Sequence, residues 1–216
     1  GIWLYRLEVL GIYIFLLLFL YYLKTRRFRN LVVCFSCLLC LGIYHTVMRW
    51  YDRPCPSLVF YNVRGCPAIH CIAEDGTSWL NYADTLSDKR RLQAVAANYW
   101  RRHQLLPPIE VTADCQNVDF CRHQQIVFYH GCRICMVTDN RWRNKSAASP
   151  LFINYMYLCK GYNGRLEELT GLFSPSCILL DASLSDDRKQ FFREECKRLH
   201  LHFITLSEEG SVRFLL

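Results

Sequence analysis

The segment CILLDASLSDDRKQFFREECKRLHLHFITL, residues 177–206, is the part of the chain most informative about its architecture. It begins with an apolar strand pattern, continues with a helical pattern and ends with a second strand pattern. In the helical part, Phe192, Cys196 and Leu199 recur at helical spacing and form one apolar stripe. Ser185 is a suitable N-cap, and the two acids after it favour the positive end of the helix. The segment therefore predicts a β-α-β unit.

The preceding residues follow a similar alternation of short strands and helices. We expect strands at 57–63, 68–73, 77–83, 118–121, 125–130, 133–138 and 152–160, a helix within 87–106 and a short helix within 164–173. The C-terminal segments LHFITL and SVRFLL are expected to pair as a hairpin around the turn SEEG. Hairpins followed by β-α-β-α-β predict a mixed-sheet α/β domain, and its length of about 165 residues is enough for a real core.

Two apolar runs precede this domain. Residues 9–23 contain no charge in 15 positions, and residues 31–48 contain none in 18. A membrane-spanning helix needs roughly 20 mostly apolar residues, so we predict transmembrane helices at about 7–23 and 31–48. The domain boundaries are then 1–50 for a helical hairpin and 51–216 for the α/β domain. A signal peptide is an alternative for the first run, and buried soluble helices are an alternative for both.

The positive charge of the chain is concentrated in the apolar part. Six Lys and Arg residues against Glu8 alone give residues 1–50 a net charge of +5, out of +7 for the chain. Four of these cations lie in the loop KTRRFRN between the two runs. Cytoplasmic loops are enriched in Lys and Arg, so we predict that this loop is cytoplasmic, that both helices contact membrane lipid, and that residues 51–216 lie on the outer face of the membrane.

The 13 cysteines do not form a recognisable zinc motif. The C-x-x-C pair outside the apolar runs, Cys132 and Cys135, lies in a predicted strand, where positions three apart face opposite sides. A zinc ribbon would need a second such pair. If the domain faces an oxidising compartment, disulfides are expected, but the sequence does not give their connectivity.

The order of these elements resembles the C-terminal region of ComEC-type DNA-uptake membrane proteins, in the form found in Bacteroidetes-like sequences. The resemblance rests on the membrane hairpin, on LVFYNVRGCPAIHCIAEDGTSWL (58–80) and on residues 177–216. It implies a metallo-β-lactamase-like domain of reduced size, an upstream polytopic channel region as partner, and a role in competence. It further implies a multi-pass protein of the bacterial inner membrane whose C-terminal domain faces the periplasm. It also implies a zinc-dependent site, which in this family opens with Asp-Val-Gly-Gln-Gly-Asp where this chain has residues 61–66.

The residues that would bind zinc are not found at the expected spacing. An active site of this kind needs a His-x-His-x-Asp-His loop, and none of the seven histidines lies in one. His200 and His202 remain candidates for a metal pair, with a surface or packed pair as the alternative. Asp84 is a further candidate ligand, with a helix N-cap as the alternative. We therefore predict a degenerate site without a cofactor.

Two basic segments are candidates for DNA-phosphate contacts: YWRRH at the end of the predicted helix and RWRNK in a polar loop. Cations interleaved with aromatic rings suit single-stranded DNA. The predicted contacts are Arg101, Arg102, Arg141, Arg143 and Lys145. A solvated helix end and an exposed loop are the simpler interpretations of the same residues.

These observations predict a non-catalytic, membrane-anchored terminal domain of a DNA-uptake channel that guides DNA. Two alternatives stay open: a divergent metal-dependent nuclease or phosphodiesterase, and a membrane-tethered protein-interaction domain.

Overall fold

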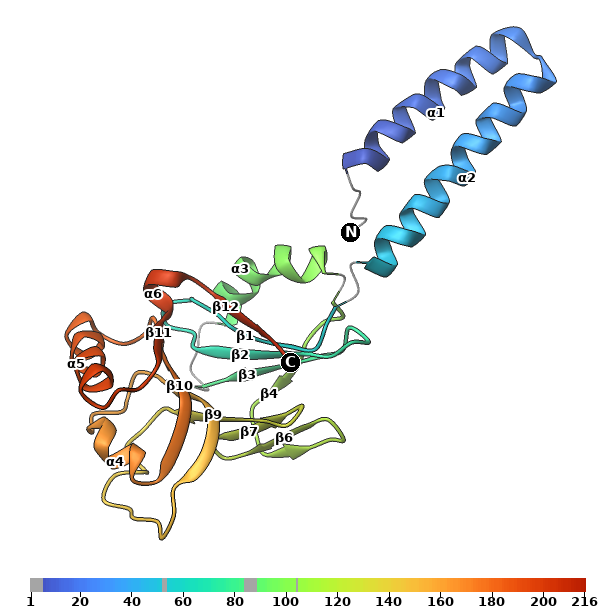
Figure 1. Ribbon diagram of the computed structural model, residues 1–216. Helices are drawn as coiled ribbons and strands as arrows, with labels where there is room; N and C mark the ends of the chain where they lie inside the picture. The colour runs from blue at the N-terminus through green and yellow to red at the C-terminus, as the bar shows by residue number, and fades with distance from the viewer. Residues whose placement is uncertain (1–5, 52–53, 84–88, 104) are drawn as a thin grey trace. The chain divides into compact units, whose positions relative to one another are not determined.

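The computed structural model describes residues 6–51, 54–83, 89–103 and 105–216 (Figure 1). By their internal contacts the residues group into two compact units, 1–53 with 99–104 and 54–98 with 105–216. The first unit contains the helices α1 (Arg6–Thr25) and α2 (Phe28–Tyr51). Within them, Leu7–Thr25 and Phe28–Met48 are long and apolar enough to cross a membrane. The two predicted apolar helices are thus confirmed as elements.

Helices α1 and α2 pack against each other as a hairpin. Gly11 allows this close approach, because a Cβ atom there would lie 2.3 Å from a methyl carbon of Leu41. The buried carboxylate of Glu8 on α1 lies 2.6 Å from Nδ1 of His45 on α2. Most other side chains of the pair are apolar and exposed, as expected for a surface that faces lipid rather than water.

The second unit is built on two mixed sheets. The five-stranded sheet has the order β12-β1-β2-β3-β4, and the seven-stranded sheet has the order β11-β10-β9-β8-β7-β6-β5. The strands of the first are β1 (Ser57–Phe60), β2 (Ala68–Ile72), β3 (Ser78–Tyr82), β4 (Ile109–Val111) and β12 (Val212–Leu215). Those of the second are β5 (Cys115–Gln116), β6 (Phe120–His123), β7 (Ile126–Tyr129), β8 (Cys132–Val137), β9 (Leu151–Leu158), β10 (Phe173–Leu180) and β11 (Phe203–Thr205).

The main core lies between the two sheets. Phe60, Trp79, Phe120 and Tyr157 belong to one buried cluster that draws on both sheets. A second cluster lies on the other face of the seven-stranded sheet, under α4 (Leu166–Thr170) and α5 (Asp186–Arg198). Helix α3 spans Lys89–Arg102, and its residues up to Asn98, which belong to this unit, lie beyond the five-stranded sheet (Figure 1). The mixed-sheet α/β fold predicted from the sequence is confirmed.

The predicted C-terminal hairpin is wrong. Strand β11 pairs parallel with β10 at one edge of the seven-stranded sheet, whereas β12 pairs antiparallel with β1 in the other sheet. The first three residues of SEEG lie in a short helix, α6 (Leu206–Glu209), and its last residue, Gly210, caps that helix with φ +84°. The chain therefore crosses between sheets here, because β1 offers a free edge that β12 can pair with.

Two local predictions are confirmed. Ser185 caps α5, since its hydroxyl accepts a hydrogen bond from the backbone N–H of Arg188. Cys135 is buried in the cluster under the helices, whereas Cys132 packs against the core between the sheets. The two thiols therefore face opposite sides of β8. All 13 cysteines are described and all are free thiols.

Candidate functional site

The strongest candidate site lies where three parallel strands end. Strands β8, β9 and β10 run side by side in parallel, and their last residues, Val137, Leu158 and Leu180, are register partners. The carboxyl ends of parallel strands are the usual place for ligand sites in α/β sheets. Here a cavity of about 530 Å³ opens between these ends and the turns after β1 and β3; we call it the strand-end cavity. It is lined by Gly65, Pro67, Ala83, Thr138, Asp139, Cys159, Lys160, Gly161 and Ser183.

A chain of hydrogen bonds fixes the loops around the strand-end cavity. The backbone N–H of Lys160 donates to Ser183 Oγ at 3.1 Å, and the N–H of Ser183 donates to Asp181 Oδ2 at 2.7 Å. The hydroxyl of Tyr157, buried in the core, donates to the other carboxylate oxygen of Asp181. Burial raises the pKa of Asp181, against the opposing effect of these hydrogen bonds. These hydrogen bonds to Asp181 thus hold the loop that carries Ser183 in place.

The acidic group that lines the cavity is already paired. Arg141 donates to both carboxylate oxygens of Asp139, at 2.8 to 3.0 Å. Burial favours the neutral acid, but the hydrogen bonds from Arg141 outweigh it and lower the pKa of Asp139. The carboxylate is therefore charged and balanced by the guanidinium, which leaves Lys160 as a cation with no ion-pair partner among the described residues.

These donors do not suit a metal site. Zinc is bound by thiolates, imidazoles and carboxylates, but burial raises the pKa of the Cys159 thiol well above its ordinary value, and an ammonium group lines the same cavity. Among the described residues, no group of three or more His, Cys, Asp and Glu side chains could hold a metal ion. The zinc site implied by the resemblance does not fit the described residues around this cavity.

The two histidines predicted as metal candidates do not line the strand-end cavity. His200 is exposed and has φ +53°, just after α5. His202 lies before β11, and its Nδ1 is 3.2 Å from Sγ of Cys177. Asp84 lies outside the described residues.

The basic loop 141–145, by contrast, borders the cavity. Arg141 lines an adjoining cavity of about 240 Å³ that shares Ala83 and Thr138 with the strand-end cavity. Trp142 holds the loop in place, because its Nε1–H donates to Gln125 Oε1 at 2.5 Å and its ring packs edge-on against Phe173.

The other predicted DNA contacts are differently placed. Arg143 lies 3.4 Å from a carboxylate oxygen of Glu168, and the ammonium of Lys145 lies over the Trp142 ring, 5.2 Å from its centroid. Arg101 and Arg102 are exposed in the last turn of α3. Whether any of the five binds DNA stays a prediction.

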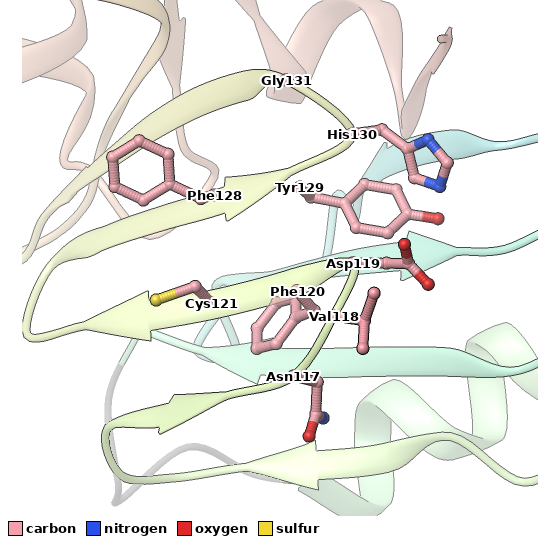
Figure 2. A pocket seen from close by; sticks show the side chains of 9 residues that line it. All are labelled: Asn117, Val118, Asp119, Phe120, Cys121, Phe128, Tyr129, His130 and Gly131. Carbon is pink, nitrogen blue, oxygen red and sulfur yellow. The ribbon is translucent and has the colours of Figure 1, made fainter.

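Another hollow, of about 240 Å³, lies at the tips of the β5–β8 strands (Figure 2). Its floor is made by core side chains, including Phe120 and Tyr129, and the Tyr129 hydroxyl donates to the carbonyl of Ile72 at 2.6 Å. Val118 at its rim is fully exposed. Its lining includes Asp119, Cys121 and His130, but it contains no Lys or Arg. The strand-end cavity, which has a cation and two hydroxyl groups on its lining, is the better candidate for an anion.

Lys160, Ser183 and Asp181 were not among the residues predicted from the sequence. The signal for them was present, since CKG follows the apolar strand segment FINYMYL and DAS follows CILL. Polar residues directly after two neighbouring parallel strands mark a shared sheet edge.

The chain thus combines two helices that are long and apolar enough to cross a membrane with a mixed-sheet α/β domain, a layout typical of membrane-anchored proteins. The chain belongs to the ComEC C-terminal domain family, whose model matches residues 58–216. No curated protein and no solved structure shows significant similarity to it. Membership of this family indicates a role in competence, the uptake of DNA.

Proposed function

We propose that this domain is a non-catalytic, membrane-anchored terminal module of a DNA-uptake channel, and that it guides incoming DNA on the outer side of the inner membrane. The proposal includes the upstream channel region as partner and a degenerate metallo-β-lactamase-like origin. Two facing mixed sheets with helices on their outer sides support that origin.

The observation that carries the proposal is the donor set of the strand-end cavity. Hydrolysis of a phosphodiester requires an activated water and stabilisation of charge on the phosphoryl group, which two metal ions supply in nucleases of this type. Lys160 and the Asp139–Arg141 pair provide charge at the cavity, but neither generates hydroxide at neutral pH. These residues therefore favour binding of a phosphate group without its cleavage.

The outward orientation is supported by the basic segment KTRRFRN, residues 24–30, which spans the end of α1, the link at residues 26–27 and the start of α2. Cations in a short loop favour its retention in the cytoplasm. The rest of the chain after α2 then lies on the opposite side of the membrane.

The test is to incubate the purified chain, in detergent micelles, with labelled single- and double-stranded DNA in the presence of zinc or manganese. We expect strands of unchanged length, and no stoichiometric metal in the protein by mass spectrometry. Cleavage that disappears in a variant lacking His200, His202 or Asp84 would instead support the divergent nuclease.

A further inference from the structure

We propose that the strand-end cavity is a metal-independent phosphate-binding site in which Lys160 supplies the positive charge. The inference rests on the proposed function for the source of the phosphate, which is the backbone of a single DNA strand.

The cavity has the size and lining of a ligand site. Its volume of about 530 Å³ lies within the roughly 300–1,000 Å³ of typical small-molecule pockets. Besides the ammonium of Lys160, its lining contains the hydroxyls of Thr138 and Ser183. Each hydroxyl accepts a hydrogen bond from the protein, from Gln125 Nε2 and Lys160 N respectively, and keeps its own proton to donate to an oxyanion.

The backbone that presents Lys160 is held rigidly. The Lys160 N–H is anchored to Ser183, and Ser183 is anchored to the buried Asp181. A cation on a fixed loop loses less entropy on binding than one on a mobile loop. Lys160 itself is exposed, so its ammonium group can reach an anion without leaving a buried partner.

Two glycines shape the backbone around the cavity. Gly161 has φ +117°, and a Cβ atom there would lie 2.2 Å from the carbonyl oxygen of Thr138, so this glycine lets the loops after β8 and β9 pack closely. Gly65, in the turn between β1 and β2, has φ +84°, and an added Cβ atom would meet no described atom within 4 Å. The backbone at Gly65 is therefore open to the approach of a ligand.

The charge balance favours an anion. Because Arg141 neutralises Asp139, the remaining full charge among the described lining residues is that of Lys160. The adjoining cavity adds one cation, Arg122, and one carboxylate, Asp114, to the Asp139–Arg141 pair. Lys160 therefore gives the described lining of the two cavities together a net charge of +1, and a DNA strand with one phosphate at Lys160 would continue past Arg122.

The test compares wild type with Lys160→Ala in maltoside micelles with excess chelator, using a short fluorescein-labelled oligodeoxythymidylate. Lys197→Ala, an exposed lysine on α5, is the matched control, and Lys160→Arg should retain binding. We expect Lys160→Ala to weaken DNA binding about three- to tenfold and to reduce the salt slope by about 0.7. Inorganic phosphate should show ³¹P line broadening with wild type and not with Lys160→Ala.

Each result decides one of the two proposals. Phosphate broadening that depends on Lys160, without DNA binding, would retain the site and refute DNA guiding. DNA binding that is equal in wild type and Lys160→Ala, with no Lys160-dependent broadening, would refute the site and leave DNA guiding standing. Lys160-dependent binding of phosphatidylglycerol vesicles, but not of the oligonucleotide, would overturn the assignment to DNA.

Discussion

Individual residues at the carboxyl ends of β8, β9 and β10 shape the candidate site. Gly161 is the most constrained of them, because it combines a left-handed backbone with close approach to Thr138. Ser183 and Asp181 stabilise the neighbouring loop through hydrogen bonds. The geometry of the cavity thus depends on side chains that are small or buried.

Gly161→Ala should destabilise the domain by about 2 kcal/mol or more, because a strained φ alone costs roughly 1–3 kcal/mol and the added methyl group meets a carbonyl oxygen. Gly171→Ala is the control, since Gly171 has φ −67° and its nearest atom to an added Cβ is 3.6 Å away. Urea unfolding measures both. Equal stabilities of the two variants would show that the loop does not have this conformation.

His70 predicts a dependence of stability on pH. It is buried on β2, and its Nδ1 lies 2.8 Å from the Tyr61 hydroxyl. Burial lowers the pKa of His70 from 6.5 to about 3. Below pH 6.5 the unfolded chain takes up a proton that the folded chain rejects, so stability falls as the pH decreases toward 3.

The slope from His70 should approach about 1.4 kcal/mol per pH unit between those limits. His70→Gln should flatten it, whereas His123→Gln, at an exposed position, should not. Denaturant unfolding near pH 7 and about pH 5 measures the difference between wild type and variant. Comparing wild type with His70→Gln isolates the contribution of His70 from that of Asp181. The raised pKa of Asp181 has the opposite effect, because it lowers stability as the pH rises. Parallel pH profiles of wild type and His70→Gln would contradict a buried neutral imidazole.

Among the elements, strand β12 pairs with a partner that its local sequence pattern does not predict, since it pairs with β1 and not with β11. Its alternating residues place Phe214 against Tyr155 and Phe60, with ring centroids 4.5 and 5.9 Å apart, and leave Arg213 exposed. The strand thereby closes the free edge of β1 and covers one end of the core.

Phe214→Ala should therefore cost about 2 kcal/mol, less than the ~3–5 kcal/mol of a fully buried Phe, because Phe214 is only partly buried. Arg213→Ala, one residue earlier on the opposite face, should change stability by less than about 0.5 kcal/mol. Thermal unfolding compares them. If both substitutions had the same effect, β12 would not pair with β1 in this register.

The sequence predicts the elements well where a periodic pattern is long or capped. Helix α5 and strands β8 and β9 follow from apolar spacing and from Ser185. The pairing partners of strands are harder to predict than the strands themselves. Strands β11 and β12 are close in sequence, and no local pattern distinguishes a hairpin from a crossover between sheets. Strands β4 and β5, of three and two residues, are too short for a pattern.

The site was predicted less completely for a similar reason. The basic loop was found from its composition, but Lys160 meets Thr138 and Gly65 only after three strands and a turn of the other sheet are assembled. A single Lys-Gly pair in the sequence does not indicate a binding site by itself. Lys160 becomes part of a candidate site because the register of β8, β9 and β10 brings the ends of these strands together.

For the complete chain, the predicted topology can be tested with Cys55, which is exposed just before β1. In intact cells, after reduction, a membrane-impermeant maleimide should label the chain, and Cys55→Ser should lose most of that label. This follows if the basic loop at 24–30 is cytoplasmic. Labelling that appears only after the membrane is permeabilised would place the domain on the cytoplasmic side.

The most direct test of a metal-free, non-hydrolytic DNA contact is the salt dependence of single-stranded DNA binding in excess chelator. Phosphate contacts made by Lys and Arg release counterions, so log K should fall linearly with log salt, by about 0.7 for each contact. We predict measurable binding at low salt with such a slope, unchanged by added zinc, and recovery of the DNA at full length. Binding that is absent in chelator and restored by zinc or manganese, or recovery of shortened strands, would contradict it.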